Sequence, residues 1–265
     1  VNQIGNGLIP LQRAAWRGNY EILRLLIEKG ANVNVKDKWD STALLEAIQE
    51  GHLKIIKLLI EKGADVNIKN EAGDTPLMVA ARRGDIEVLK LLLNKGANVS
   101  DKNKKNSTAM NFAVIAFPNY YEAISLLLKA GCKLSIDMEL LIAASRGDIT
   151  GINEALKKGA NINTRDLNNQ TPLARAIRSS KFEIVEFLIK KRADVNVTDG
   201  FGDSILTAAI KASNIKIVKI LIQSGADVNA YPKALASAYH TRYETNNIQA
   251  AEEIIRILIA AGATR

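Results

Sequence analysis

The chain has 265 residues, 47% of them hydrophobic and 24% charged, with one cysteine and a formal net charge of +8 at pH 7. This composition indicates a globular protein long enough to bury a large core. No apolar run approaches the roughly 20 residues that span a bilayer, which argues against a transmembrane helix. The lone Cys132 excludes an internal disulfide and favours a reducing compartment, so we expect a cytoplasmic protein. Because the chain starts at Val1 without Met, a leader could have been removed, and a secreted effector or a periplasmic protein stays open.

One helix-ending position, usually a glycine followed by alanine and an Asx residue, recurs along the chain. Its eight occurrences are separated by 33, 33, 35, 28, 33, 33 and 37 residues. A single match would be weak, whereas eight in phase are a strong signal of an internal repeat. These helix-ending residues are Gly30, Gly63, Gly96, Gly131, Gly159, Arg192, Gly225 and Gly262. We expect units at roughly 5–37, 38–70, 71–103, 104–136, 137–166, 167–199, 200–230 and 231–265, within a single domain of residues 1–265.

The unit at 71–103 shows how each repeat is expected to fold. Thr75 is placed to cap a first helix, Pro76 suits its first position, and Gly84 can end it in the left-handed conformation. Asp85 is a natural cap for a second helix, whose apolar residues recur at helical spacing and make a wide face. An extended hairpin then leads to the next unit. One unit cannot bury so wide a face, so neighbouring units must stack on both of its sides.

Two places interrupt the regular spacing. The unit at 104–136 carries a two-residue insertion around Phe117–Tyr120, whose proline breaks or lengthens the turn between the helices. Only 7 residues separate Gly131 from Met138, the expected start of the next inner helix, where the first units have 12. A full hairpin cannot fit there. We predict a notch at about 132–138 in one continuous solenoid, with two abutting four-unit stacks as the alternative.

The last unit, 231–265, is irregular. We expect Ala234–Tyr239 to be its inner helix, His240–Asn247 an enlarged polar loop, and Ile248–Ala261 the outer helix that closes the stack. The 131–138 junction and this loop should exchange their amide hydrogens fastest.

The units resemble the ankyrin repeat, whose period is about 33 residues and whose marker is T-P-L-H-x-A. Thr75-Pro76-Leu77 and Thr171-Pro172-Leu173 carry the marker, and the resemblance covers nearly the whole chain. It implies an all-α solenoid of helix-turn-helix units with short β-hairpin loops, in a right-handed stack with a concave binding face. The marker histidine is absent from every unit, and Gln12 stands in its place in the first. The side-chain bonds that this histidine makes between neighbouring loops are therefore expected to be missing.

Partners of ankyrin-repeat proteins usually bind the concave face, which hairpin tips and inner-helix ends form. The resemblance places both tryptophans there, at positions where the stack needs no ring, and Trp and Arg are enriched in interface hot spots. Packing across the first hairpin is the alternative role for the tryptophans. The basic residues would form a stripe suited to an acidic partner surface, unless they are only a solvated face. The expected partner-binding residues are Trp16, Arg17, Lys38, Trp39, Gln49, Arg82, Arg83, Lys104, Lys105, Arg146, Arg178, Phe201 and Lys211.

No constellation of residues points to catalysis, a metal or a cofactor. His240 has no Cys or His partner at metal spacing, and His52 stands at a helix start, where a structural role is expected. Phosphate-binding glycine motifs and a nucleophile elbow are missing from the sequence. We therefore expect a monomeric, non-enzymatic scaffold that needs no cofactor and binds a partner protein. The alternatives are a basic surface for nucleic acid or anionic lipid, which lacks interleaved aromatics, and a regulatory or recognition domain of a larger enzyme or bacterial effector.

Overall fold

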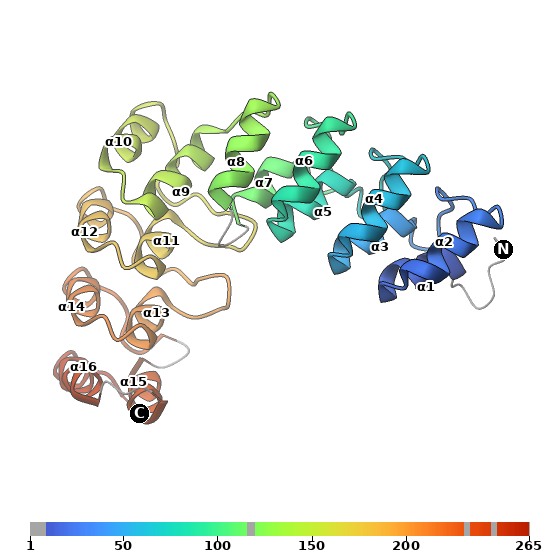
Figure 1. The fold of residues 1–265 in the computed structure, drawn as a ribbon. Coiled ribbons are helices and arrows are strands. Elements are labelled where there is room, and N and C mark those ends of the chain that lie inside the picture. Colours follow the sequence, from blue (N-terminus) through green and yellow to red (C-terminus); the bar gives the residue numbers. More distant parts are fainter. Residues whose placement is uncertain (1–8, 116–119, 231–233, 245–247, 265) are drawn as a thin grey trace. The chain divides into compact units, whose positions relative to one another are not determined.

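A computed structural model of the chain describes residues 9–115, 120–230, 234–244 and 248–264. The chain divides into two units, Val1–Lys133 and Leu134–Arg265, and each is described here by itself. Over the described ranges it forms sixteen helices and no β-strand. Every helix is short, and successive helices alternate between the first and second member of a pair (Figure 1).

The first unit contains four consecutive helix pairs (Figure 1). Its helices are α1 (Pro10–Arg17), α2 (Tyr20–Glu28), α3 (Ala43–Glu50), α4 (Leu53–Glu61), α5 (Pro76–Arg83), α6 (Ile86–Asn94), α7 (Ala109–Ala113) and α8 (Tyr120–Lys129). The first helix of each pair packs on the first helix of the next, so α1 contacts α3, α3 contacts α5 and α5 contacts α7. The second helices form a neighbouring row, in which α2 contacts α4 and α6 contacts α8.

The second unit repeats the same arrangement (Figure 1). Its helices are α9 (Ile136–Arg146), α10 (Ile149–Lys157), α11 (Pro172–Arg178), α12 (Phe182–Lys190), α13 (Ile205–Lys211), α14 (Ile215–Gln223), α15 (Ala234–Glu244) and α16 (Ile248–Ala260). The first helices pack in the order α9, α11, α13, α15, and the second helices α12, α14 and α16 pack in series. The all-α stack of helix pairs expected from the sequence is therefore confirmed within each unit.

Local sequence explains where the helices start and stop. The Thr75 hydroxyl oxygen accepts from the Met78 N–H at 3.3 Å at the start of α5, and the Asp85 carboxylate accepts from the Val88 N–H at 3.1 Å at the start of α6. Gly84 ends α5 in the left-handed conformation with φ 66°. All three roles were predicted from the sequence and are confirmed.

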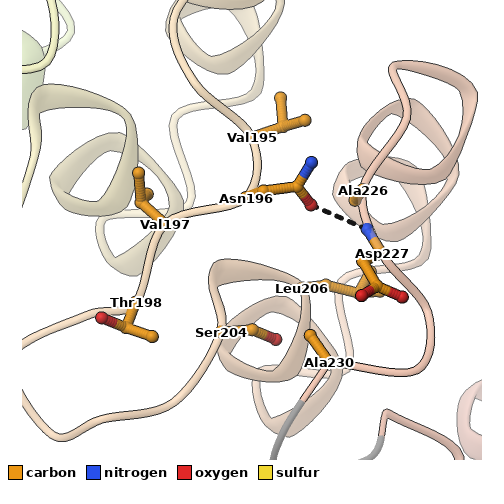
Figure 2. Close-up of a pocket in the computed structure, with 9 residues that line it drawn as sticks. All are labelled: Val195, Asn196, Val197, Thr198, Ser204, Leu206, Ala226, Asp227 and Ala230. Atoms are coloured by element: carbon orange, nitrogen blue, oxygen red, sulfur yellow. Dashed lines mark hydrogen bonds between the residues drawn. The ribbon is translucent and has the colours of Figure 1, made fainter.

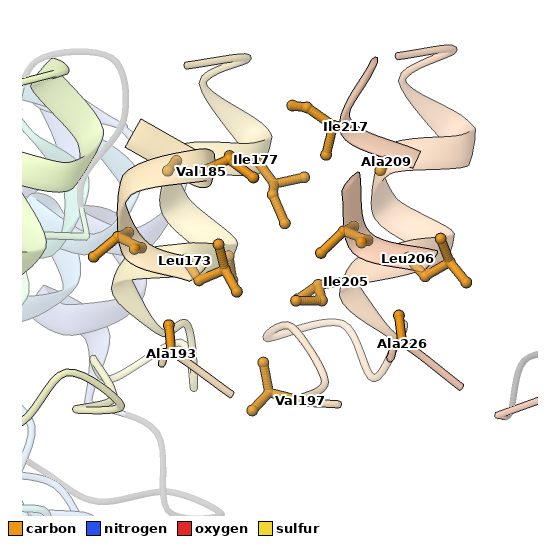
Figure 3. Close-up of a cluster of buried hydrophobic side chains, with 14 of the residues drawn as sticks. Leu173, Ile177, Val185, Ala193, Val197, Ile205, Leu206, Ala209, Ile217 and Ala226 are labelled. Atoms are coloured by element: carbon orange, nitrogen blue, oxygen red, sulfur yellow. The ribbon is translucent and has the colours of Figure 1, made fainter. Parts of the chain in front are cut away.

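In the second unit, the apolar residues of neighbouring pairs meet in one core. In the second unit, Ile177 of α11 and Ile205 and Ala209 of α13 are at most 1% exposed and belong to the same cluster (Figure 3). Full burial of an Ile or Leu side chain contributes about 1.5–3 kcal/mol. Because these side chains come from different pairs, each pair depends on its neighbours for that contribution.

The connections between pairs are turns, and this corrects the expectation of β-hairpins. In the described residues, the only β-type pairing is an isolated antiparallel bridge between Thr198 and Ser204. Instead, five turns share one scheme, in which an Asx side-chain oxygen accepts from the backbone N–H four residues later, at 2.8–3.1 Å. In four of them it also accepts from the N–H two residues later. These Asx residues are Asp37, Asn70, Asn103, Asp166 and Asp199.

Asparagine side chains tie successive repeats together. Asn34 accepts from the Asp65 N–H at 2.8 Å and donates to the Gly63 carbonyl at 3.0 Å. Asn67, Asn196 and Asn229 make the same pair of bonds to the repeat that follows each of them. The glycine carbonyl that each amide reaches lies just beyond the end of the second helix of the following repeat, so the asparagine bonds the turn that leaves that helix.

Two expected boundaries were wrong. Helix α9 begins at Ile136, two residues before Met138, because Ser135 caps it by accepting from the Met138 N–H at 3.2 Å. Helix α15 continues to Glu244, so residues 240–244 are helical rather than part of the expected 240–247 loop. The remainder of that loop, 245–247, and the insertion at 116–119 lie outside the described residues.

Candidate functional site

Both tryptophans lie in the first unit and line one pocket of about 190 Å³. Trp16 lies in the last turn of α1 and Trp39 at the tip of the turn before α3, and they are 44% and 50% exposed. The Arg13 guanidinium lies 4.9 Å from the centroid of the Trp16 ring, and the Lys38 ammonium lies 4.2 Å from that of Trp39. The rings are thus available at the surface and carry cations on their faces.

Four polar residues complete the lining of this pocket: Gln12, Arg13, Asp37 and Glu46. The Gln12 amide nitrogen donates to the Val35 carbonyl at 3.1 Å and to the Ser41 carbonyl at 2.7 Å. This corrects the expectation that no side chain replaces the bonds of the marker histidine, since Gln12 reaches the neighbouring turn in the first repeat. The sequence gave no reason to assign Gln12, Asp37 or Glu46 to the site, because each is an ordinary residue of a turn or helix start.

Two expected anchors of the first unit, Arg82 and Arg83, are engaged within the chain. Arg82 pairs with the carboxylate of Asp74, which is 6% exposed, and its guanidinium lies 4.5 Å from the Phe112 ring centroid. Arg83 donates to the backbone carbonyl of Gln49. These arginines remain exposed, but they also hold neighbouring repeats together.

The remaining expected residues of the first unit lie at the surface. Arg17, Gln49, Lys104 and Lys105 have exposed side chains. Within the part of the chain that the structure describes, the side chains of Arg17, Lys104 and Lys105 form no ion pair. Unlike Arg82, they can meet a partner without giving up a bond inside the repeat array.

Four of the expected residues, Arg146, Arg178, Phe201 and Lys211, lie in the second unit. Arg178 pairs with Asp199 at 3.5 Å and lies 4.8 Å from the ring centroid of Phe201, which is 76% exposed. Lys211 pairs with Asp203 at 2.6 Å. Arg146 is exposed and lines a shallow pocket between α9 and α10. Phe201 is the most exposed of the expected aromatic residues.

A second pocket of the second unit, of about 370 Å³, is mainly apolar (Figure 2). Asn196, which lines it, accepts from the Asp227 N–H at 2.8 Å as part of the asparagine ladder (Figure 2). Its other lining residues include Val197, Leu206 and Ala226, which belong to the core. It brings together no set of groups for acid–base or nucleophilic chemistry.

His52 and Cys132 each contact a backbone carbonyl of the preceding repeat. His52 immediately precedes α4, and its Nε2 lies 3.1 Å from the Trp16 carbonyl oxygen in the neighbouring repeat, which agrees with the expected structural role. The Cys132 thiol donates to the Val99 carbonyl at 3.5 Å, and burial raises the pKa of this thiol. Among the described residues, no group of three His, Cys, Asp or Glu side chains is arranged to hold a metal ion.

Sequence comparison identifies the family. A model of ankyrin repeats matches residues 1–70, 66–138 and 140–231, most of the chain. The helix pairs and turns described above fit this match, and the chain belongs to the ankyrin-repeat family. No curated protein matches it significantly. In the described residues, no helix is long and apolar enough to cross a membrane. Ankyrin repeats are in general protein-protein interaction modules.

Proposed function

We propose that the chain is a non-enzymatic scaffold that holds a partner protein or peptide on its recognition face. We define the recognition face as the turn tips and the carboxyl-terminal ends of the first helices, the concave side of an ankyrin array. The exposure of Trp16 and Trp39 carries the proposal. The neighbours Ala14 and Ala15 are 4% and 0% exposed, so the core of α1 is filled without the Trp16 ring. Rigid exposed rings of this kind are frequent interface anchors.

Exposed cations support the same face. Arg17, Lys104 and Lys105 are exposed and unpaired among the described residues, and the chain as a whole carries a net charge of +8. Cations at a rim speed association with an acidic partner and improve specificity more than affinity. Arg82, Arg83, Arg146, Arg178 and Lys211 would contribute their exposed edges, and Phe201 would supply an aromatic contact in the second unit.

We further propose that the array consists of eight repeats in one domain of residues 1–265, with a shortened junction near 132–138 and with 231–265 as its last repeat. We also propose that the protein is monomeric and cytoplasmic. Both tryptophans precede residue 133, so their fluorescence follows the first unit while circular dichroism follows both. Coincident urea transitions by the two signals are expected for one stack. Separate transitions would support two abutting stacks, and a dimer mass in light scattering would overturn the monomer.

Affinity capture followed by mass spectrometry, with charge-matched variants, tests the recognition face. The test variant is Arg17→Glu/Lys104→Glu/Lys105→Glu, and a second test variant is Trp16→Ala/Trp39→Ala. The control, Lys29→Glu/Lys62→Glu/Lys95→Glu, makes the same charge change at exposed second-helix ends. Partners captured by the parent and the control and lost from both test variants are expected. Equal capture by all four proteins would rule out the face.

Salt dependence separates a protein partner from nucleic acid or anionic lipid. Phosphate-driven binding weakens steeply between low and physiological salt and does not depend on base sequence. We expect the captured protein to remain bound at physiological salt, and we expect little binding of random duplex DNA or of phosphatidylserine vesicles there. Tight binding of either probe, lost in the basic test variant alone, would favour the alternative function.

A further inference from the structure

The tryptophan pocket of the first unit contains an acceptor without a donor. Gln12 is 5% exposed, and its side-chain oxygen Oε1 has no hydrogen-bond partner among the described residues. The orientation of the amide is fixed, because its nitrogen donates to the carbonyls of Val35 and Ser41 and the oxygen could not replace it there. A buried acceptor left unpaired is unfavourable, so this pocket is suited to a ligand that brings an N–H.

Two carboxylates line the same pocket. Asp37 uses Oδ1 to accept from the N–H groups of Trp39 and Ser41, at 2.9 and 2.8 Å. Glu46 accepts from the Ser41 hydroxyl at 2.7 Å. In the described part of the chain, neither carboxylate forms an ion pair. The pocket is therefore lined by two carboxylates, two indole rings and Gln12, whose oxygen is closed to solvent, and Arg13 is the one cation among its lining residues. Its net charge favours a further cation with several N–H groups.

The second unit shows what accompanies a turn aspartate elsewhere in this chain. Asp166 and Asp199 hold their turns by the same scheme as Asp37. At Asp166, Arg175 lies nine residues later and donates to Oδ2 from Nε and Nη2, at 2.8 and 2.6 Å. At Asp199, Arg178 lies 21 residues earlier and donates to Oδ2 at 3.5 Å. Both aspartates thus receive a guanidinium from a first helix.

The equivalent positions around Asp37 carry no arginine. Nine residues after Asp37 the chain has Glu46, and 21 residues before it the chain has Trp16. Both residues line the pocket together with Asp37. The space that Arg175 fills beside Asp166 therefore corresponds to open space beside Asp37, with an added carboxylate and an added ring.

We propose that this pocket binds the guanidinium of an arginine side chain supplied by a partner peptide. The guanidinium takes the place beside Asp37 that Arg175 has beside Asp166, donates to the Gln12 oxygen and stacks on an indole ring. The planar fork of arginine serves all three acceptors, whereas the ammonium of lysine is a compact point charge. This inference rests on the proposed function and adds the chemistry of one partner residue. That residue is basic, whereas the exposed cations of the recognition face suit an acidic part of the partner surface.

One arginine of the chain also lines the pocket and needs a separate test. The Arg13 guanidinium lies over the Trp16 ring and, among the described residues, pairs with neither Asp37 nor Glu46. If Arg13 were the natural occupant, removing it would open the site and tighten binding of an added arginine. We expect Arg13→Ala to leave that affinity within about twofold.

The first experiment titrates the intact chain with the peptide acetyl-Gly-Arg-Gly-amide and follows the two indole N–H signals by NMR. The chain has only two tryptophans, and both line the pocket, so these signals report on it alone. Saturable shifts of both indole signals and of the Gln12 side-chain amide are expected. Peptides with citrulline or lysine in place of arginine should bind about tenfold more weakly, because each lacks either the charge or the fork.

Two matched variants test the role of the turn aspartate. Asp37→Asn removes the charge but keeps the turn, since Asn70 and Asn103 hold equivalent turns, and it should weaken the arginine peptide about tenfold. Asp40→Asn removes a neighbouring charge that does not line the pocket and should have no effect. Glu46→Arg places an arginine nine residues after Asp37, as at Arg175, and should abolish binding while raising the melting temperature.

Several outcomes would overturn the inference. These are unmoved indole signals at millimolar arginine peptide, equal binding of citrulline, tighter binding of a trimethyl-lysine peptide or an acidic peptide, and equal affinities of the Asp37 and Asp40 variants. Tightening of at least about tenfold by Arg13→Ala would assign the site to the chain's own arginine. None of these results affects capture through Arg17, Lys104 and Lys105, so failure of the pocket is distinguishable from failure of the scaffold function.

Discussion

The turns at Asp37 and Asp166 have the same backbone hydrogen bonds and different surroundings. Beside Asp166, whose side chain is 3% exposed, the chain places Arg175, which pairs with its carboxylate. Beside Asp37 it places Glu46 and two exposed indole rings, and a pocket remains. The repeat requires the turn aspartate or asparagine in both units. What stands nine residues later decides whether that turn is only structural or is also available to a ligand.

A second difference between the units concerns how the first helices end. In the first unit, α1, α3 and α5 end at glycines with φ between 66° and 82°. In the second unit, α11 and α13 are followed by Ser180 and Ser213 with φ of 51° and 52°. Glycine adopts the left-handed conformation without strain, and α9 of the second unit also ends at one, Gly147, whereas Ser180 and Ser213 adopt this conformation with a side chain. The ends of α11 and α13 therefore carry backbone strain that the ends of α1, α3 and α5 avoid.

The largest expected effect is the loss of the buried ion pair. Arg175→Met should destabilise the chain by about 3–5 kcal/mol, because it leaves the buried Asp166 carboxylate without its cation. Urea unfolding followed by circular dichroism measures the change. Lys219→Ala, which removes the exposed pair with Glu253 in the same unit, is the control and should cost no more than about 1 kcal/mol. Similar losses of unfolding free energy for both variants would mean that the buried ion pair of Asp166 stabilises the chain no more than an exposed one.

Adding a side chain at a left-handed position should have a smaller effect. Gly63 has φ 86°, and nothing lies within 4 Å of a Cβ built on it, so Gly63→Ala introduces strain without a clash. We expect a loss of about 1–2 kcal/mol, measured by urea unfolding with tryptophan fluorescence. Glu61→Ala, at an exposed helical position nearby, should remain within about 0.5 kcal/mol. A neutral Gly63→Ala would show that this turn tolerates strain.

The reverse substitution in the second unit should stabilise it. Ser180→Gly relieves the left-handed strain, and we expect a gain of about 0.5–1 kcal/mol after the entropy cost of glycine is included. The control is Ser179→Gly, at a position with φ −86°, which should only destabilise. A loss from both substitutions would indicate that Ser180 is held by interactions stronger than its strain.

The smallest expected effect concerns Cys132. Burial raises the pKa of this thiol, so the folded chain keeps it protonated at neutral pH and it should react with iodoacetamide more slowly than in urea. The folded pKa lies above the unfolded one. The contribution of this thiol to the free energy of unfolding is therefore fully present below the ordinary cysteine pKa. It is lost as the pH rises through the pKa of the thiol in the folded chain. Cys132→Ala should remove this pH dependence; equal alkylation rates in folded and unfolded chains would contradict it.

The sequence predicted most of the helices correctly because their signals are local. Thr75, Asp85 and Gly84 act within one turn of the helices they bound, so a single unit contains the information. The start of α9 was misplaced, since the cap at Ser135 is a one-residue signal next to an irregular junction. The extent of α15 was also missed, because His240 and the polar residues after it read as a loop although the helix continues.

The candidate site was only partly foreseeable. Trp16 and Trp39 could be selected because aromatic residues are rare in this chain and the repeat does not need them. Gln12, Asp37 and Glu46 could not, since each has an ordinary role in a repeat when it is considered alone. Their common property, acceptors without a matching cation, appears only when residues from two repeats are brought together.

The sequence by itself determined the repeat period, the family and the alternation of capped helices, because helix propensity, caps and left-handed glycines act over a few residues. The tertiary structure decided which polar side chains are paired and which are left open. Arg82 and Arg178 pair with carboxylates of the array, whereas Gln12 and Asp37 have acceptor oxygens without a partner among the described residues in the pocket of Trp16 and Trp39. Pairing depends on distances between side chains of different repeats, and the order of residues along the chain does not contain those distances.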